Sequence, residues 1–240
     1  MSERCRALVQ VFSATHALAD AAAEFVVARA AAAIALNGRF SLVLSGGTTP
    51  RQLYARLASL PSRDRIDWGH VHLFWGDERC VPPTDAASNY RMARETLIDH
   101  VPIPALHVYR IKGEDDPVFA AVEYERTLRA ALGEGVTGDT TSGPDLVLLG
   151  LGPDGHTASL FPHTTAARET TRWVVAEEVA VLPTWRVTVT PPFVNKARGV
   201  LFLVAGAEKA ATLGAVLEGP VALEALPAQR IAPRGRSPLW

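Results

Sequence analysis

The stretch that decides the fold is Phe40-Ser41-Leu42-Val43-Leu44-Ser45-Gly46-Gly47-Thr48-Thr49-Pro50. Its first five residues form a short apolar run that is typical of a buried strand. Residues 45–49 contain two glycines and are typical of a turn, and residues 51–60 have the pattern of a helix. A strand that passes through a tight turn into a helix is typical of α/β proteins, in which strand and helix alternate.

The same alternation runs along the rest of the chain. We expect strands at 7–12, 40–44, 71–75, 107–111, 145–149, 173–179, 186–190 and 200–205, and helices at 15–37, 51–60, 89–100, 118–132 and 208–217. Thr15 is a candidate N-cap of the first helix, and Gly38 is a candidate stop. Nearly continuous apolar strands at 146–149 and 200–204 indicate burial on both faces. The predicted fold class is α/β, with a doubly wound, mainly parallel sheet and helices on both faces.

Composition excludes several classes of protein. The chain has 240 residues, of which 48% are hydrophobic and 20% charged, and 24 Lys and Arg oppose 25 Asp and Glu for a net charge of −1. This balance excludes disorder as the main state. It also lacks the basic excess of proteins that bind nucleic acid or membrane surfaces. We expect one α/β domain over residues 1–240, with the second half as the part able to form a smaller lobe and the Gly-rich stretch 133–143 as a surface loop.

Cysteines and apolar runs indicate the compartment. Cys5 and Cys80 lie far apart and have no metal-ligand or disulfide spacing. No uninterrupted apolar run reaches the roughly 18 residues of a membrane span. We therefore expect a cytoplasmic monomer that binds no metal and whose partner is a small molecule.

Three polar clusters follow predicted strands, where ligands bind in such sheets. The first is the turn of Ser45, Gly46, Gly47, Thr48 and Thr49, with Pro50 predicted at the first helical position. Its glycines let the backbone approach a ligand, and its free N–H groups and helix dipole favour an anion such as phosphate. The turn is not a Walker loop, because no Gly-Lys-Ser/Thr closes it. An ordinary turn capped by Thr49 explains the segment equally well.

The second cluster is Trp75-Gly76-Asp77-Glu78-Arg79. Consecutive charges just past a strand are often a solvated loop. Alternatively, Asp77 and Arg79 place an acid and a guanidinium over the site, since arginine suits bidentate phosphate contacts. The position of the cluster favours this second interpretation.

The third cluster is Gly150-Leu151-Gly152-Pro153-Asp154-Gly155-His156-Thr157. Its first six residues match the dinucleotide-binding pattern G-x-G-x-x-G, with Glu177 or Glu178 about where a ribose-binding acid is expected. However, the pattern occurs late in the chain, and Pro153, Asp154 and His156 crowd a turn that needs bare backbone. Asp154 and His156 instead suggest a catalytic pair, since histidine can take a proton near neutral pH. A histidine that caps its own helix is the remaining alternative.

Two further cations stand out. Lys209 follows the strand at 200–205 and is placed to reach an anion, although a lone helical lysine is usually solvated. Arg186 opens an apolar strand, which suggests a paired or ligand-bound charge. The sequence has no G-x-S-x-G, which disfavours a serine α/β-hydrolase.

Together, these clusters resemble the 6-phosphogluconolactonase family from the second predicted strand to the last helix. The segments that carry the resemblance are Leu44–Pro50, Gly76–Arg79, Ser88-Asn89-Tyr90, Leu149–Pro162, Arg186-Val187-Thr188 and Gly206-Ala207-Glu208-Lys209. The resemblance implies hydrolysis of 6-phosphoglucono-δ-lactone to 6-phosphogluconate, the second step of the oxidative pentose phosphate pathway, without a cofactor.

Glucosamine-6-phosphate deaminase/isomerase is related to this family by fold and is the main alternative. It shares the Gly-Gly turn, the Asp after the third strand and the Asp-Gly-His, but it also has a catalytic Glu five residues beyond the histidine. This chain has Phe161 at that position. A sugar-phosphate binding protein without activity is the second alternative, which the presence of both Asp154 and His156 disfavours.

The expected mechanism divides the site into two ends. The turn at 45–49 would bind the phosphate with Lys209 and either Arg79 or Arg186, and the sequence leaves the choice among these cations open. His156 would activate water as a general base. Either Asp154 or Asp77 would orient its imidazole.

Overall fold

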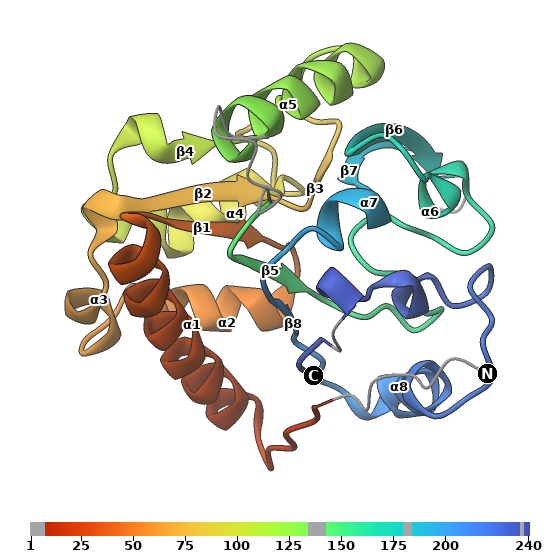
Figure 1. Cartoon of the computed structure of the whole chain (residues 1–240), viewed down its shortest axis with the longest axis horizontal. Coiled ribbons are helices and arrows are strands. Elements are labelled where there is room, and N and C mark those ends of the chain that lie inside the picture. Colours follow the sequence, from red (N-terminus) through yellow and green to blue (C-terminus); the bar gives the residue numbers. More distant parts are fainter. Residues whose placement is uncertain (1–7, 134–142, 180–183, 236–237) are drawn as a thin grey trace.

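The computed structural model describes residues 8–133, 143–179, 184–235 and 238–240 (Figure 1). Its centre is a five-stranded sheet in the order β4-β2-β1-β5-β8. Every neighbouring pair in this sheet is parallel. The strands are β1 (Phe40–Leu44), β2 (Val71–Trp75), β4 (Val108–Tyr109), β5 (Leu146–Leu149) and β8 (Val200–Phe202). The predicted fold class, a mainly parallel α/β sheet, is confirmed.

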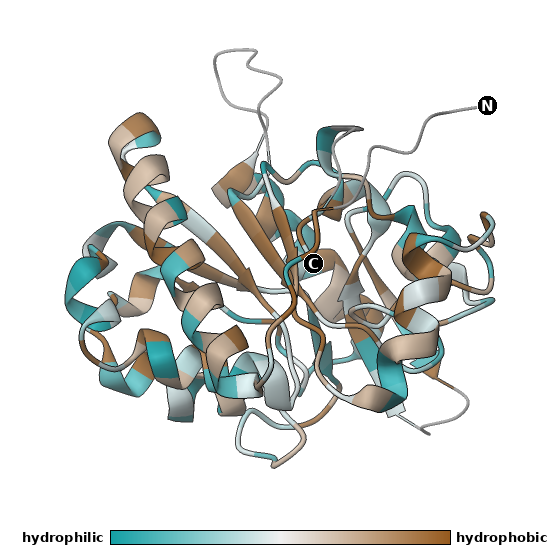
Figure 2. Ribbon diagram, turned by 90° about the horizontal axis from the view of Figure 1, so that it is seen from below, coloured by the Kyte–Doolittle hydropathy of each residue, from teal (hydrophilic) through white to brown (hydrophobic). Residues whose placement is uncertain are grey.

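Burial on both faces explains why most residues of these strands are apolar. All residues of β1, β5 and β8 are buried. Val43 of β1 lies between Phe74 of β2 and Val147 of β5. In Figure 2 the central strands are accordingly the most hydrophobic part of the ribbon, whereas hydrophilic residues gather on the helices and loops.

The helices in the described part of the chain are α1 (Thr15–Asn37), α2 (Thr48–Leu57), α3 (Ser62–Arg65), α4 (Asn89–Thr96), α5 (Pro117–Leu132), α6 (Thr165–Arg168), α7 (Pro191–Val194) and α8 (Ala210–Leu217). The five predicted helices are present as α1, α2, α4, α5 and α8, and three short helices, α3, α6 and α7, are additional. Gly38 ends α1 as predicted, with a φ of +71° and its N–H donating to Ile34 O. The prediction that Thr15 is the N-cap is wrong: Ala14 holds that position, and no described side chain caps the helix. Among the described residues, no helix is long and apolar enough to cross a bilayer.

A second sheet departs from the parallel pattern. It is antiparallel and contains β3 (Asp77–Arg79), β7 (Thr184–Val189) and β6 (Val174–Val179), in the order β3-β7-β6. Only residues 180–183 separate β6 from β7, and a parallel pair needs a crossover of a dozen or more residues. The short connection therefore requires antiparallel pairing. The interpretation of 76–79 as a solvated loop is wrong, since Asp77–Arg79 form a strand in which Asp77 and Glu78 are buried.

Several predicted boundaries shift. Leu8 makes a single bridge to Leu239 instead of starting a strand over 7–12, and residue 7 lies outside the described residues. Helix α2 begins at Thr48, so Pro50 is its third residue, where the missing N–H still costs no helical bond. The helix predicted at 89–100 ends at Thr96 and is followed by a short 3-10 turn. Most of the loop predicted at 133–143 lies outside the described residues.

Two buried tyrosines fix the carboxyl ends of the two central strands. The Tyr54 hydroxyl accepts from Ser45 N (2.9 Å) and donates to Ser45 O (2.7 Å). The Tyr124 hydroxyl makes the same pair of bonds with Trp75, at 2.7 and 2.9 Å. Burial raises the pKa of both phenols, which keeps them neutral and able to donate and accept. Each strand thus ends in a fixed position, directly where the polar clusters begin.

A stack of histidine and tyrosine rings lies at the β4 side of the parallel sheet, with His72 on β2, Tyr109 on β4 and His107 in the 3-10 turn before β4. The rings of His72 and His107 are stacked with centroids 4.0 Å apart, and His72 Nδ1 lies 3.2 Å from the Tyr109 hydroxyl. Burial lowers the pKa of His72 to about 4, and the positive charges of His107, Arg39 and His70 add to this effect. His72 is therefore neutral in the folded protein at pH values where a free histidine is half charged.

We expect the His72→Phe variant to be less sensitive to acid than the wild type. The unfolded chain takes up a proton at His72 near pH 6.5, but the folded chain does so only near pH 4. The unfolded state thus binds more protons in this window, and wild-type stability falls as the pH drops from 6.5 to 4. Urea midpoints at pH 7.5 and 4.5 measure the effect. The same loss of stability in both proteins would contradict it.

Candidate active site

The predicted polar clusters meet in one cavity of about 290 Å³ beyond the carboxyl ends of β1, β5 and β8. Segments 45–50, 77–89, 150–158 and 203–209 each supply part of its wall. Nine of the eleven predicted site residues line it: Ser45, Gly46, Gly47, Thr48, Thr49, Asp77, Arg79, His156 and Lys209. The sheet topology explains this convergence, because the carboxyl ends of parallel strands share one edge.

The turn between β1 and α2 presents free N–H groups to the cavity. Gly47 is the N-cap residue of α2, with a φ of +105° that favours glycine. No side chain of the described residues caps α2, and its first turn has no acidic residue. The partial positive charge of the helix terminus therefore remains available to an anion in the cavity. The interpretation of the turn as one capped by Thr49 is wrong.

Two polar atoms at the cavity wall lack protein partners. The Ser45 hydroxyl and Arg79 Nε are buried, and neither forms a hydrogen bond within the described residues. Arg79 is held by a bond from its Nη1 to Ala87 O (2.5 Å). Buried polar groups in native proteins nearly always have partners. This wall is thus built to make further hydrogen bonds to a polar ligand.

Arg186 lies behind the cavity wall instead of on it. It faces Arg79 in the antiparallel register of β3 and β7, is 7% exposed, and donates from Nη1 to the Thr184 hydroxyl (2.9 Å). Burial lowers the pKa of Arg186, and the charge of Arg79 lowers it further. Two neighbouring guanidinium groups raise the local positive potential, which favours an anion beside Arg79.

His156 and Asp154 form a hydrogen-bonded pair. His156 Nδ1 lies 2.6 Å from Asp154 Oδ1, and the same oxygen accepts from the His156 backbone N–H (3.2 Å). No helix begins at His156, because the next one is α6 at Thr165, so the interpretation of a histidine capping its own helix is wrong. Asp154 does not line the cavity itself. Asp154 contacts the Nδ1 side of the imidazole, so Nε2 is the ring nitrogen that does not contact Asp154.

Asp77 has other partners. Its Oδ2 accepts from the Ser159 hydroxyl (2.7 Å), and its Oδ1 accepts from Asn89 Nδ2 (3.3 Å). The structure thus selects Asp154 over Asp77 as the carboxylate that contacts His156. It also adds Asn89 and Ser159 to the site through their hydrogen bonds to Asp77, and no sequence pattern assigns either residue a role. Asn89 stood within a quoted segment, but nothing in its spacing showed that its side chain reaches Asp77.

Glu78 is a structural carboxylate below the cavity. It is 2% exposed and accepts from the Ser88 hydroxyl and from the backbone N–H groups of Arg79, Asn89 and Tyr90. Burial raises its pKa, and these four hydrogen bonds oppose the shift. Glu78 therefore fixes the segment that carries Asn89.

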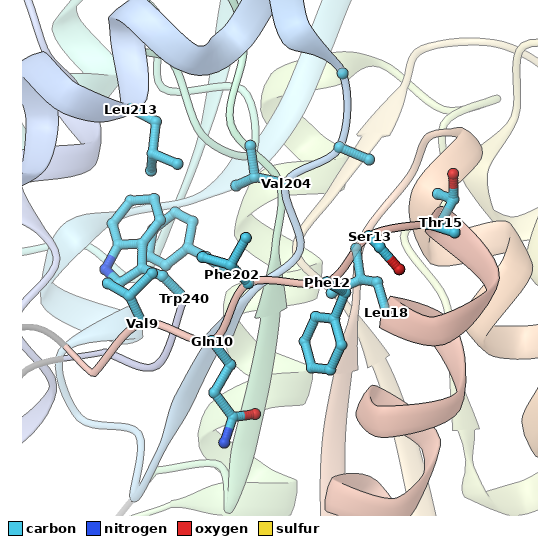
Figure 3. A pocket seen from close by; sticks show the side chains of 14 residues that line it. Val9, Gln10, Phe12, Ser13, Thr15, Leu18, Phe202, Val204, Leu213 and Trp240 are labelled. Carbon is cyan, nitrogen blue, oxygen red and sulfur yellow. The ribbon is translucent and has the colours of Figure 1, made fainter.

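A second cavity, of about 300 Å³, is lined by residues of 9–18, β8, the Ala205-Gly206 turn, α8 and the C-terminus (Figure 3). The rings of Phe202 and Trp240 stack in its wall with centroids 3.8 Å apart, and Leu213 and Val204 lie nearby. Its lining contains no acidic or basic residue. Of these two cavities, only the polar one is lined by titratable side chains, among them Asp77, His156 and Lys209.

Comparison with known proteins identifies the family of the chain. The family profile described as "Glucosamine-6-phosphate isomerases/6-phosphogluconolactonase" matches residues 13–240. The chain belongs to this family. The 6-phosphogluconolactonase of Haemophilus influenzae is 36% identical over 228 residues, covering 95% of this chain and 93% of the relative. That of Synechocystis sp. is 40% identical over 228 residues, covering 95% and 92%.

Solved structures of family members have the same fold. The chain is similar to 6-phosphogluconolactonase from Trypanosoma cruzi, with a TM-score of 0.84, 31% identity, and coverage of 100% of this chain and 94% of that one. It also resembles a monomeric glucosamine-6-phosphate deaminase, with a TM-score of 0.78, 18% identity, and coverage of 93% and 92%. At that identity the second likeness shows the fold alone.

Phe161 occupies the position at which the resemblance places the deaminase glutamate. Its ring packs against the imidazole of His156, with centroids 4.4 Å apart and planes at 35°. An apolar ring thus lies beside the catalytic candidate in place of a second acid.

Gly152 makes room for the His156–Asp154 pair. A β-carbon on Gly152 would lie 2.1 Å from His156 Nδ1 and 2.7 Å from Asp154 Oδ1. The dinucleotide interpretation also lacks its ribose-binding acid. Neither Glu177 nor Glu178 lines the cavity, and Glu177 accepts hydrogen bonds from the Thr165 hydroxyl and Ala166 N at the start of α6. The second glycine of the pattern thus leaves space for a side-chain pair and not for a dinucleotide.

Gly152→Ala should break the His156–Asp154 hydrogen bond, since the added methyl group overlaps both side chains. Gly150→Ala is the matched control, because a β-carbon there meets nothing within 4 Å. NMR of the ¹⁵N-labelled histidine side chains should show the Nδ1 proton of His156 in the wild type and in Gly150→Ala, but not in Gly152→Ala. An unchanged signal in Gly152→Ala would contradict the proposed packing.

Proposed function

We propose that this protein is a 6-phosphogluconolactonase, which hydrolyses 6-phosphoglucono-δ-lactone to 6-phosphogluconate in the oxidative pentose phosphate pathway. One observation carries the proposal: a His–Asp pair and an uncapped helix terminus flanked by Lys209 and Arg79 share one cavity. The His–Asp pair can activate water, and the helix terminus with its cations can hold a phosphate dianion. Relatives of 36–40% identity that carry this name support it.

The phosphate would bind at the turn of Ser45, Gly46, Gly47, Thr48 and Thr49. Free N–H groups at the start of α2 and the unpartnered Ser45 hydroxyl supply donors. Lys209 and Arg79, which also line the cavity, supply the countercharge. Arg186 would act indirectly, by adding positive potential behind Arg79.

The lactone would react at His156. Because Asp154 accepts a hydrogen bond from Nδ1–H, Nε2 carries the lone pair that takes a proton from water. The oxygen of that water attacks the lactone carbonyl carbon, and the bond from this carbon to the ring oxygen then breaks. The imidazolium returns its proton to the ring oxygen, which becomes a hydroxyl group. General-base help of this kind is worth about 10²–10⁴-fold.

Each alternative lacks one feature that its chemistry needs. The deaminase reaction needs the acid whose position Phe161 occupies beside His156. A binding protein without activity has no use for a carboxylate that holds an imidazole in one orientation. We propose further that the enzyme acts as a cytoplasmic monomer without a cofactor and forms one domain over residues 1–240, in line with a buried core shared by both sheets.

Acid release from freshly prepared 6-phosphogluconolactone tests the function directly. The wild type should release acid well above the spontaneous rate. Parallel assays measure ammonia from glucosamine 6-phosphate and the binding of NADPH, and both should be negative. A lactone rate equal to the background would overturn the proposal, and ammonia release would favour the deaminase.

His156→Ala should lower kcat by about 10²–10⁴-fold, because the general base is lost, and should change KM less. His16→Ala, which removes an exposed histidine on α1, is the control and should behave as the wild type. Steady-state rates corrected for spontaneous hydrolysis provide the measurement. If kcat is retained, His156 has no part in the chemistry.

Lys209→Ala should raise KM by about 10–100-fold with kcat nearly unchanged, the pattern expected when a charged phosphate contact is lost. Lys112→Ala removes an exposed lysine outside the cavity and should have no effect. Product should also protect the wild type against heat more than it protects Lys209→Ala. Equal protection would show that Lys209 is not a ligand.

A further inference from the structure

Asn89 has a fixed orientation in the cavity wall. It is the first residue of α4, is 3% exposed and lines the cavity. Its Nδ2 donates to the Asp77 backbone carbonyl (3.0 Å) and to Asp77 Oδ1 (3.3 Å). The Asp77 backbone carbonyl can only accept a hydrogen bond. The amide nitrogen, and not the amide oxygen, must therefore face Asp77.

The amide oxygen consequently points away from Asp77, towards the phosphate-binding turn. A β-carbon on Gly46 would lie 2.0 Å from Asn89 Oδ1. Glycine at this position thus allows the carboxamide to lie directly against the turn. Within the described residues no donor is bonded to this oxygen. It is an acceptor left open beside the cavity.

The backbone around Asn89 is fixed by the buried carboxyl group of Glu78. Glu78 accepts from Asn89 N (2.7 Å), Tyr90 N (2.8 Å) and the Ser88 hydroxyl (2.9 Å). A side chain whose backbone and amide group are both fixed loses little entropy when it binds a ligand. The Asn89 oxygen is thus preorganised.

The chemistry of the cavity indicates what this oxygen binds. Lys209, Arg79 and the N–H groups of α2 are donors, which suit a phosphate or a developing oxyanion. Each ring hydroxyl group of a sugar can instead donate a hydrogen bond, for which the protein must supply an acceptor. The two Asp77 carboxylate oxygens already accept from Asn89 and Ser159. Asn89 Oδ1 has no such bond.

We propose that Asn89 is a specificity-determining residue, whose Oδ1 accepts a hydrogen bond from one ring hydroxyl of the phosphorylated lactone. The inference rests on the proposed function and names the part of the substrate that the site recognises besides its phosphate. A site built to bond a hydroxyl discriminates against the analogue that lacks it, because its polar group is then left unpaired.

The test compares 6-phosphogluconolactone with its 2-deoxy, 3-deoxy and 4-deoxy analogues. In the wild type, one analogue should lose about 10–100-fold in kcat/KM relative to the parent lactone. In Asn89→Ala, the parent should be slowed, but its advantage over that one analogue should shrink to about threefold or less. The ratios for the other two analogues should stay as in the wild type.

Two further variants separate recognition from folding. Asn89→Ser keeps a small acceptor and should retain part of the discrimination if Asn89→Ala folds poorly. Asn195→Ala removes an amide that bonds Arg230 O and Ala232 N away from the cavity, and it should leave all ratios unchanged.

The outcomes are distinguishable. A merely structural Asn89 would slow all four lactones by the same factor in Asn89→Ala, and this result would overturn the inference. A wild type that hydrolyses all four equally would overturn it as well. A wild type that does not hydrolyse the parent lactone would instead overturn the proposed function.

Discussion

The carboxylate of Asp77, buried at the junction of the two sheets, is the constraint on which the site depends. A buried polar group needs hydrogen-bond partners, and the Asp77 carboxyl group has them in Ser159 and Asn89, which lie in distant parts of the chain. Ser159 also donates its backbone N–H to the hydroxyl of Thr188, the residue opposite Asp77 in the antiparallel register. The loop after β5, the start of α4 and the second sheet are thereby joined at one point.

This junction places the two halves of the proposed chemistry in one cavity. Ser159 anchors the loop that carries His156, and Asn89 lies against the glycine turn that begins α2. Tyr54 and Tyr124 fix the strand ends from which the turn and β3 emerge. The turn proposed to bind phosphate and the loop that carries His156 are therefore held by buried, hydrogen-bonded groups, which makes their geometry rigid.

Local patterns predicted the parallel sheet well, because the apolar residues of a buried strand such as Leu146–Leu149 and of the long helix Thr15–Asn37 are contiguous in the sequence. The strand Asp77–Arg79 could not be predicted in this way. Three charged residues indicate a solvated loop unless donors from elsewhere cover them, and Glu78 is covered by the start of α4. The antiparallel pairing of β6 and β7 follows from the short connection between them. The alternation of strand and helix in the first half of the chain predicted parallel strands there instead.

The sequence by itself determined the α/β class, the three polar clusters and the Asp154–His156 pair, whose members are separated by one residue. Only the tertiary structure decided that Asp154 and not Asp77 contacts His156, that Arg186 lies behind Arg79, and that Asn89 belongs to the site. The reason is physical. The Asp77–Ser159 bond spans 82 residues, and whether such groups meet depends on how the sheets pack, which no local pattern encodes.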